Sequence, residues 1–259
     1  MDRLTIVKVG GKVVEEEPSL QQLLRDFTAI AGYKILVHGG GRLATQIAEQ
    51  LGIENRMVDG RRITDKETLK VVTMVYAGLV NKNIVAGLQA LRQNALGLTG
   101  ADLNIICSRK RPVGNIDYGF AGDVKAVDGA MISKLLKDGA IPVLAPLTHD
   151  GNGCLLNTNA DTIAGETAKE LVNYFDVRLV YCFEKNGVLM DENDDQSVIR
   201  QINRKLFDQY VEQGIISGGM IPKLENAFQA IQAGVKEVII TRADGINIGK
   251  GTTIIPSAR

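Results

Sequence analysis

The sequence predicts an α/β fold, a three-layer αβα sandwich with a mainly parallel central sheet. Short runs of Val, Ile and Leu alternate with longer segments of helical spacing, which is the pattern of parallel βα units. The short runs are apolar at almost every position, as expected for strands covered on both faces. The 259 residues are 45% apolar, so the chain can bury a full core as one domain or as two closely joined lobes.

The predicted elements follow from these runs. The β-branched runs predict strands at 5–9, 34–38, 141–146, 177–183 and 236–241. The longer segments, several of which begin at Ser or Asp and end near Gly, predict helices at 19–31, 43–51, 65–94, 128–138, 161–174, 205–213 and 222–233. Short alternation broken by Pro112 and three glycines predicts a hairpin appendage near 103–127 that closes over a ligand. The acidic turn at 191–195 fits a surface excursion.

Two glycine turns follow predicted strands near the N-terminus. Lys8 lies just before a glycine pair at 10–11, and a glycine triplet at 39–41 follows the second strand. Glycines let backbone amides face a ligand, and a neighbouring lysine adds positive charge, so each turn fits an anion site. Either turn alone is equally consistent with an ordinary strand-to-helix connection. Together they favour two walls of one phosphate cradle, and the chain has neither a Walker motif nor a dinucleotide fingerprint.

Three further clusters carry polar side chains at predicted helix starts. Arg61 and Arg62 precede the long predicted helix, where an arginine can hold a carboxylate by two hydrogen bonds, although one of the pair can simply be solvated. The motif N-T-N-A-D at 157–161 has more amide and carboxylate groups than a helix cap needs. The motif G-G-M-I-P-K at 218–223 places Lys223 after two glycines, which repeats the pattern around Lys8.

Composition limits the classes of function. Thirty Lys and Arg balance thirty Asp and Glu, and no basic run is present, so a nucleic-acid partner has little support. The chain shows no signal segment and no apolar stretch of membrane-spanning length, so we expect no membrane partner and a cytoplasmic location. Three widely spaced cysteines fit buried thiols rather than disulfides, and two distant histidines do not predict a metal site. His38 fits a structural, hydrogen-bonding side chain.

Five motifs in this order resemble those of the acetylglutamate kinases, members of the amino acid kinase family. They are K-V-G-G at 8–11, H-G-G-G at 38–41, G-R-R-I-T at 60–64, N-T-N-A-D at 157–161 and G-G-M-I-P-K at 218–223. The resemblance spans residues 4 to about 241, and the last three motifs favour the acylglutamate branch. It implies the amino acid kinase fold and ATP-dependent phosphorylation of the γ-carboxylate of an N-acyl-L-glutamate, N-acetyl by default, in the second step of arginine biosynthesis.

The resemblance also implies roles for single residues. Lys8 and Lys223 would stabilise the phosphoryl group in transfer, and Asp161 would hold both lysines. Arg62 and Asn157 would bind the α-carboxylate and the N-acyl amide of the substrate. Because the attacking carboxylate is already ionised at pH 7, no general base is required.

The remaining implied contacts concern phosphate, substrate and nucleotide. Gly10, Gly11 and Gly40 would donate backbone amides to phosphate, and Gly40 and Gly41 would line the acylglutamate site. The implied nucleotide-binding residues are Glu184, Lys185, Gly187, Leu189, Ile215, Ser217, Gly219 and Lys223. Mg²⁺ would arrive with ATP, held mostly by phosphate and water.

The resemblance further implies an arrangement of lobes and subunits. An N-terminal lobe of about 1–175 would bind the acylglutamate and form a homodimer, and a C-terminal lobe of about 176–259 would bind ATP. Only seven residues precede Lys8, so we expect no inhibition by arginine, which in the family goes with an extra N-terminal helix.

Two stretches depart from the family pattern. The segments 183–189 and 242–253 differ, which leaves the adenine and ribose contacts undefined, although 251–254 still resembles the closing glycine–threonine strand. A basic stretch, R-K-R at 109–111, is either a solvated turn or a partner for the second carboxylate of an N-succinyl group.

Two different functions also fit a chain of this kind. One is a kinase of aspartate or glutamate, and the second is a non-catalytic amino-acid-binding protein of the same fold. The presence of Lys8, Asp161 and Lys223 argues against the non-catalytic protein.

Overall fold

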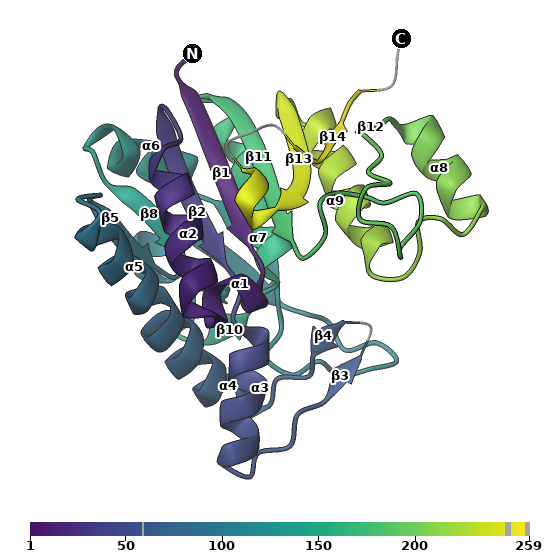
Figure 1. Ribbon diagram of the computed structural model, residues 1–259. Coiled ribbons are helices and arrows are strands. Elements are labelled where there is room, and N and C mark those ends of the chain that lie inside the picture. The colour runs from purple at the N-terminus through teal and green to yellow at the C-terminus, as the bar shows by residue number, and fades with distance from the viewer. Residues whose placement is uncertain (59, 247–249, 257–259) are drawn as a thin grey trace.

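A single eight-stranded sheet forms the middle layer of the molecule (Figure 1). The computed structural model describes residues 1–58, 60–246 and 250–256. The strands follow the order β12-β14-β13-β11-β1-β2-β8-β5, and they run parallel except that β13 and β14 pair in antiparallel fashion. Their bounds are β1 Arg3–Val9, β2 Tyr33–His38, β5 Ala95–Leu98, β8 Ile141–Leu144, β11 Asp176–Phe183, β12 Gln201–Ile202, β13 Glu237–Arg242 and β14 Thr252–Ile254. The predicted sandwich and all five predicted strands are confirmed.

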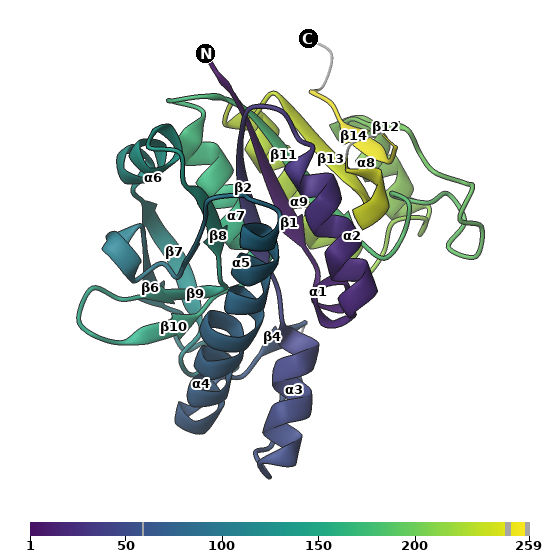
Figure 2. The ribbon, with the colours of Figure 1, turned by 60° about the vertical axis from the view of Figure 1, so that its left-hand side comes forward.

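Helices cover both faces of this sheet, as Figures 1 and 2 show. One core lies between the sheet and α1 Gly11–Glu15, α2 Glu17–Thr28, α3 Gly41–Gln50, α4 Lys66–Val72, η1 Thr73–Val80 and α5 Asn81–Ala90. The other core lies between the sheet and α6 Gly129–Lys137, α7 Ala160–Leu171, α8 Arg204–Glu212 and α9 Met220–Gln232. Successive strand side chains point to opposite faces, so Ile6 and Lys8 face α7 while Val7 and Val9 face α2.

A second, four-stranded sheet contains the predicted hairpin appendage. Its order is β10-β9-β6-β7, with β6 Ile106–Lys110, β7 Gly122–Val127, β9 Leu147–His149 and β10 Leu155–Asn157. The antiparallel pair β6–β7 confirms the hairpin, and the participation of β9 and β10 was not predicted. The small ladder of β3 Met57–Val58 and β4 Arg61–Arg62 lies at the same end of the molecule in Figure 1 as α3 and α4.

The loop between β6 and β7 is fixed against the segment that follows Arg62. The Thr64 backbone donates to the Tyr118 carbonyl at 3.0 Å, and Phe120 donates to the Thr64 carbonyl at 2.7 Å. Gly119 between them has a φ of +64°, and a Cβ there would lie 2.2 Å from the Thr64 oxygen. Only glycine fits this close approach, so Gly119 determines how the loop meets the site.

The long helix predicted at 65–94 is confirmed in extent but is not uniform. Asp65 caps it, accepting a hydrogen bond from the Thr68 amide at 2.8 Å, and a π-helical stretch at Thr73–Val80 separates α4 from α5. This stretch turns Tyr76 toward the glycines at 39–41. Contrary to the expectation from the sequence, one helix, Lys66–Ala90, is long and apolar enough by length and composition to cross a membrane, and 44% of its most apolar window is buried inside the fold.

His38 ends β2 in the interior. Its Nδ1 lies 2.7 Å from the Gly39 carbonyl, and its Nε2 lies 3.1 Å from the side-chain nitrogen of Asn81, which also donates to the Val143 carbonyl at 2.9 Å. An amide nitrogen can only donate, so Nε2 accepts and the neutral ring carries its proton on Nδ1. Burial lowers the pKa of His38 from 6.5 to about 4, with a smaller contribution from the charge of Lys82.

We predict that this histidine makes stability depend on pH. Its folded-state pKa lies below its unfolded-state pKa, so the unfolded chain binds the extra proton and stability falls as pH drops from about 6.5 toward 4. Urea unfolding at pH 7 and pH 4.5 should show that the wild type loses about 2 to 3 kcal/mol more than His38→Gln does. The variant His149→Gln serves as the control and should behave as the wild type. Equal losses in wild type and His38→Gln would contradict the assignment.

Candidate active site

A buried ion pair joins the central strand to a helix start. Lys8 is the penultimate residue of β1, and Asp161 lies in the first turn of α7, whose cap Asn159 accepts a hydrogen bond from the Thr162 amide. The Lys8 Nζ lies 2.7 Å from the Asp161 Oδ1, and the two side chains are 9% and 12% exposed. The positive end of the helix dipole also favours the carboxylate there. The pair thus stands at the carboxyl edge of the parallel sheet, where α/β folds place ligands.

Lys223 approaches the same point from α9. It lies in the first turn of α9, a helix that begins directly after the glycines at 218–219. Its Nζ lies 3.9 Å from the centroid of the Phe183 ring, and Lys8 Nζ lies 5.3 Å from the same centroid. Desolvation lowers the pKa of Lys223, and the charge of Lys8 adds to this while Asp161 and Glu184 oppose it. The three predicted catalytic residues therefore come together.

The two predicted glycine turns also meet. A Cβ placed on Gly11 would lie 3.7 Å from the backbone nitrogens of both Gly40 and Gly41, and one on Gly39 would lie 3.2 Å from the Gly11 nitrogen. The Gly39 amide donates to the Val9 carbonyl at 3.0 Å. Side chains at these positions would fill the space between the turns, so glycine keeps the backbone amides accessible.

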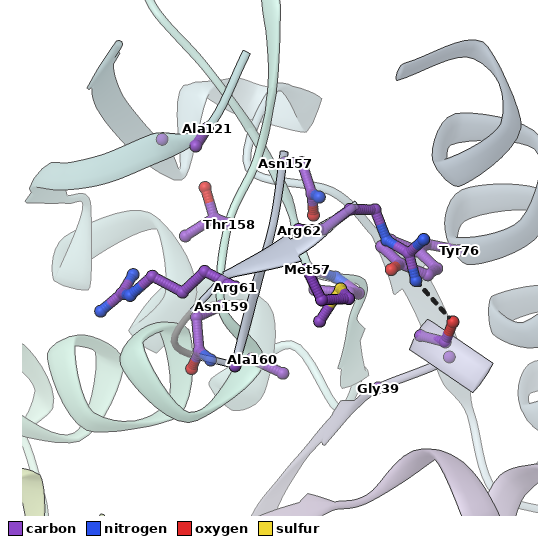
Figure 3. A pocket seen from close by; sticks show the side chains of 15 residues that line it. Gly39, Met57, Arg61, Arg62, Tyr76, Ala121, Asn157, Thr158, Asn159 and Ala160 are labelled. Carbon is purple, nitrogen blue, oxygen red and sulfur yellow. Dashed lines mark hydrogen bonds between the residues drawn. The ribbon is translucent and has the colours of Figure 1, made fainter. Parts of the chain in front are cut away.

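A cavity of about 190 Å³ opens beside this junction (Figure 3). Small residues make up much of its wall, and the polar side chains that face it belong to Arg61, Arg62, Asn157, Thr158 and Asn159. The Asn157 side-chain nitrogen donates to Thr64 Oγ1 at 2.9 Å. The predicted substrate residues Gly40, Gly41, Arg62 and Asn157 all line this cavity.

Arg62 is 8% exposed and has only neutral partners among the described residues. Its Nη2 donates to the Gly41 carbonyl and to Thr45 Oγ1, each at 2.8 Å, and its Nη1 donates to Asn55 Oδ1. Tyr76 lies beside it in Figure 3, and burial raises the pKa of that phenol, which Arg62 partly offsets. A buried guanidinium without a carboxylate partner is unfavourable in the free protein and favours an anionic ligand.

Arg61 extends from the same strand along the opposite side of the cavity (Figure 3). Desolvation lowers its pKa, and the charge of Arg111 adds to this, while Asp123 and Tyr118 oppose it. Asp123 is already paired with Arg111, whose Nε lies 3.1 Å from the carboxylate. Of the basic stretch 109–111, Arg111 is therefore engaged within the hairpin, and Lys110 lies over the Phe120 ring at 5.0 Å.

The residues predicted to bind nucleotide are spread over residues 184–223. Glu184 lies 3.8 Å from the Lys12 amine and 3.6 Å from the Arg42 guanidinium, which both follow the glycine turns. Lys185 pairs with Asp195 at 3.2 Å. Gly187 lies against Thr252 and Val198, and Leu189 pairs with Val198. The remaining predicted residues, Ile215, Ser217 and Gly219, precede α9. Their nucleotide roles stay predictions, as does the lobe boundary near 175, and 247–249 of the divergent segment lie outside the described residues.

Two aromatic residues at the site carried no functional signal in the sequence. Phe183 ends an apolar strand, and Tyr76 lies within a long apolar helix, so both fit core positions. The departure from the family pattern at 183–189 was the one hint toward Phe183. No group of three or more His, Cys, Asp or Glu side chains suited to a metal ion occurs among the described residues.

Comparison with known proteins agrees with this geometry. The sequence model of the amino acid kinase family matches residues 3–242. The acetylglutamate kinase of Parabacteroides distasonis is 68% identical over 98% of this chain and 100% of its own length, and that of Bacteroides fragilis is 68% identical over 98% and 97%. A crystal structure of a Streptococcus mutans protein superposes with a TM-score of 0.77 at 27% identity, covering 97% of this chain and 98% of that one. The chain therefore belongs to the amino acid kinase family.

Proposed function

We propose that this protein transfers the γ-phosphoryl group of ATP to the γ-carboxylate of N-acetyl-L-glutamate, giving an acyl phosphate and ADP in arginine biosynthesis. The observation that carries the proposal is the convergence of Lys8, Asp161 and Lys223 beside the glycine turns and next to the cavity that holds Arg62. The relatives at 68% identity bear the name of this activity.

The chemistry requires fixed positive charge. An anionic carboxylate must approach an anionic phosphate, and two like charges 4 Å apart repel by about 1 kcal/mol in water but by about 4 kcal/mol at an effective dielectric of 20. Lys8 and Lys223 supply the opposing charge, one from each proposed lobe, and Asp161 keeps them in register. The backbone amides of Gly10, Gly11 and Gly40 complete the proposed phosphate cradle.

The acylglutamate would lie in the cavity of Figure 3. Arg62 binds the α-carboxylate, and the Asn157 side chain meets the N-acyl amide. These contacts leave the γ-carboxylate free to face the glycine turns, and orientation of this kind supplies much of the rate enhancement in such reactions. In this scheme residues of about 1–175 bind the acid and residues of about 176–259 bind ATP.

ATP would carry Mg²⁺, which neutralises charge on the phosphate oxygens. Lys223, Glu184, Lys185 and the 215–219 segment are the proposed protein contacts of the nucleotide. The reaction draws on ATP and on amino-acid intermediates, so we propose a cytoplasmic location.

A substrate panel tests the function. We expect ADP release, and an acyl phosphate trapped as its hydroxamate by hydroxylamine, with N-acetyl-L-glutamate and not with aspartate or glutamate. N-succinyl-L-glutamate is the second candidate, because Arg61 lines the cavity with a charge that no carboxylate pairs within the described residues. A higher kcat/KM with the succinyl compound would favour that candidate, and turnover of neither N-acyl compound would refute the proposal.

Two substitutions should separate the phosphate and substrate halves of the site. Lys8→Arg keeps the charge but not the geometry of a small ammonium, so kcat should fall by roughly a hundredfold or more with little change in either KM.

Arg62→Ala removes a contact made in ground and transition states alike, so it should raise KM for the acid by roughly tenfold to a hundredfold and leave KM for ATP nearly unchanged. Steady-state kinetics on both variants checks the pattern. A higher KM for ATP in Arg62→Ala would place Arg62 in the nucleotide site instead.

We also propose a homodimer formed through the first lobe. Met74 and Leu79 are 56% and 46% exposed on one helix, and Leu96, 37% exposed, lies on β5 at the edge of the central sheet. Exposed apolar side chains on a helix and an open strand edge are both typical of subunit interfaces. Its occupant in this proposal is a second copy of the chain.

Light scattering should show twice the mass of the chain for the wild type. Leu79→Glu places a charge in the proposed interface and should shift the protein toward the monomer. Leu51→Glu is the matched control, since Leu51 is 57% exposed at the end of α3, and it should remain dimeric. An unchanged mass for Leu79→Glu would rule this face out as the interface.

A further inference from the structure

The Phe183 ring lies against both active-site lysines. The Lys223 Nζ is 3.9 Å and the Lys8 Nζ 5.3 Å from the ring centroid. Both distances fall within the range of about 6 Å over which an ammonium is attracted to the face of an aromatic ring. Each lysine thus has an aromatic partner in addition to the charge of Asp161, and Glu184 acts on Lys223 as a further carboxylate.

The strand register explains why the ring is there. Tyr181 and Phe183 are two residues apart on β11 and therefore point to the same face, and their rings stack at 6.2 Å with an interplanar angle of 11°. Lys8 on β1 lies directly opposite Tyr181. The Tyr181 hydroxyl donates to the Asp161 carbonyl at 3.2 Å. One short column of aromatic rings therefore contacts both lysines and the helix turn that carries the carboxylate.

The electrostatics of this column matter because the lysines repel each other. Burial disfavours the charged form of Lys223, and the nearby charge of Lys8 disfavours it further. Asp161 and Glu184 oppose this, but any further carboxylate would also repel the phosphates of a nucleotide. An aromatic face attracts the ammonium through its quadrupole without adding negative charge, so the N–H groups that do not face the ring stay available to phosphate oxygens.

We propose that Phe183 is a positioning residue for phosphoryl transfer, which holds Lys223, and less closely Lys8, charged and aimed at the transferring group. This inference rests on the proposed kinase function. Phe183 acts through the lysines and is not itself in contact with the reacting atoms. The competing explanation is that the ring merely fills space. The two explanations differ in whether activity depends on the negative electrostatic potential of the ring face.

Stepwise fluorination of Phe183 tests the inference. Replacing it by phenylalanine with one, two and three fluorines weakens the ring face while nearly preserving shape. The logarithm of kcat should fall with each fluorine, reaching about a tenfold loss with three, while KM for the N-acyl substrate stays constant. The matched control is the same series at Phe207, which packs 5.0 Å from the Arg204 guanidinium and away from the lysines, and it should leave kcat unchanged. A kcat that does not depend on fluorine number at Phe183 would overturn the proposal.

A second measurement does not depend on turnover. NMR of the Lys223 side chain in the substrate-free protein should show its pKa falling stepwise along the same series, because loss of the π face destabilises the charged amine. The charged groups that face this amine are Asp161, Lys8 and Glu184, and all are kept in every variant. If the wild type phosphorylates no N-acyl substrate, the proposed function fails while this titration still tests the ring. A constant pKa along the series would refute the role of the ring, whatever the activity.

Two ordinary variants complete the design. Phe183→Tyr keeps an aromatic face and should retain most of the activity, whereas Phe183→Leu keeps apolar bulk and should lose about as much kcat as the trifluoro ring. Equal activity in the Leu and Tyr variants would show that bulk alone suffices and would contradict the proposal. Circular dichroism and unfolding curves establish that each variant folds.

Discussion

The buried ion pair of Lys8 and Asp161 is the interaction on which the rest of the site depends. Removing two charges from water is costly, so a buried ion pair seldom adds net stability to a fold. The 2.7 Å contact between Lys8 and Asp161 is therefore better explained by the position it gives the lysine amine than by a gain in stability. It requires β1 at the centre of the sheet and the start of α7 above its carboxyl end. The cap at Asn159 and the hydrogen bond from Tyr181 fix that helix start from two sides. The position of β1 in the sheet, together with the start of α7, therefore determines where the Lys8 amine lies.

Positive charge exceeds negative charge around this pair, and that imbalance defines what the site accepts. Lys8 and Lys223 share Asp161, and Arg62 is buried with neutral partners only among the described residues. Each excess cation is costly in the free protein and is compensated only when an anion arrives. In the proposed function the two lysines bind phosphate, and Arg62, which lines the adjoining cavity, binds a carboxylate. The same free-energy cost that weakens the empty site therefore gives it selectivity for two different anions at once.

Sequence reasoning reached the fold and the charged residues because both leave regular signals. Continuous β-branched runs marked β1, β2, β8, β11 and β13, and glycine next to lysine marked the anion sites. It missed β5, because Ala95–Leu98 contains a glycine and follows a long helix without a clear break. It also missed the π-helical stretch around Tyr76 and the contact of Phe183 with two lysines. Tyr76 and Phe183 each lie within an apolar run, and in sequence such aromatic residues look like ordinary core residues. Only the tertiary structure shows which polar group each ring contacts.

Different residues therefore determine how the wall of the cavity packs and which charges face a ligand. Two glycines of the cavity wall leave no room for a side chain, since a Cβ on Gly122 would lie 2.5 Å from Thr158 Oγ1 and one on Gly40 would lie 3.0 Å from the Tyr76 ring. In the proposed function the motif glycines and cations carry the phosphoryl chemistry. The aromatic residues that contact them, Tyr76 beside Arg62 and Phe183 beside the lysines, lie at positions the motifs do not specify. Because a ring can orient a cation without neutralising it, changes at such positions can adjust affinity and rate while the catalytic residues stay the same.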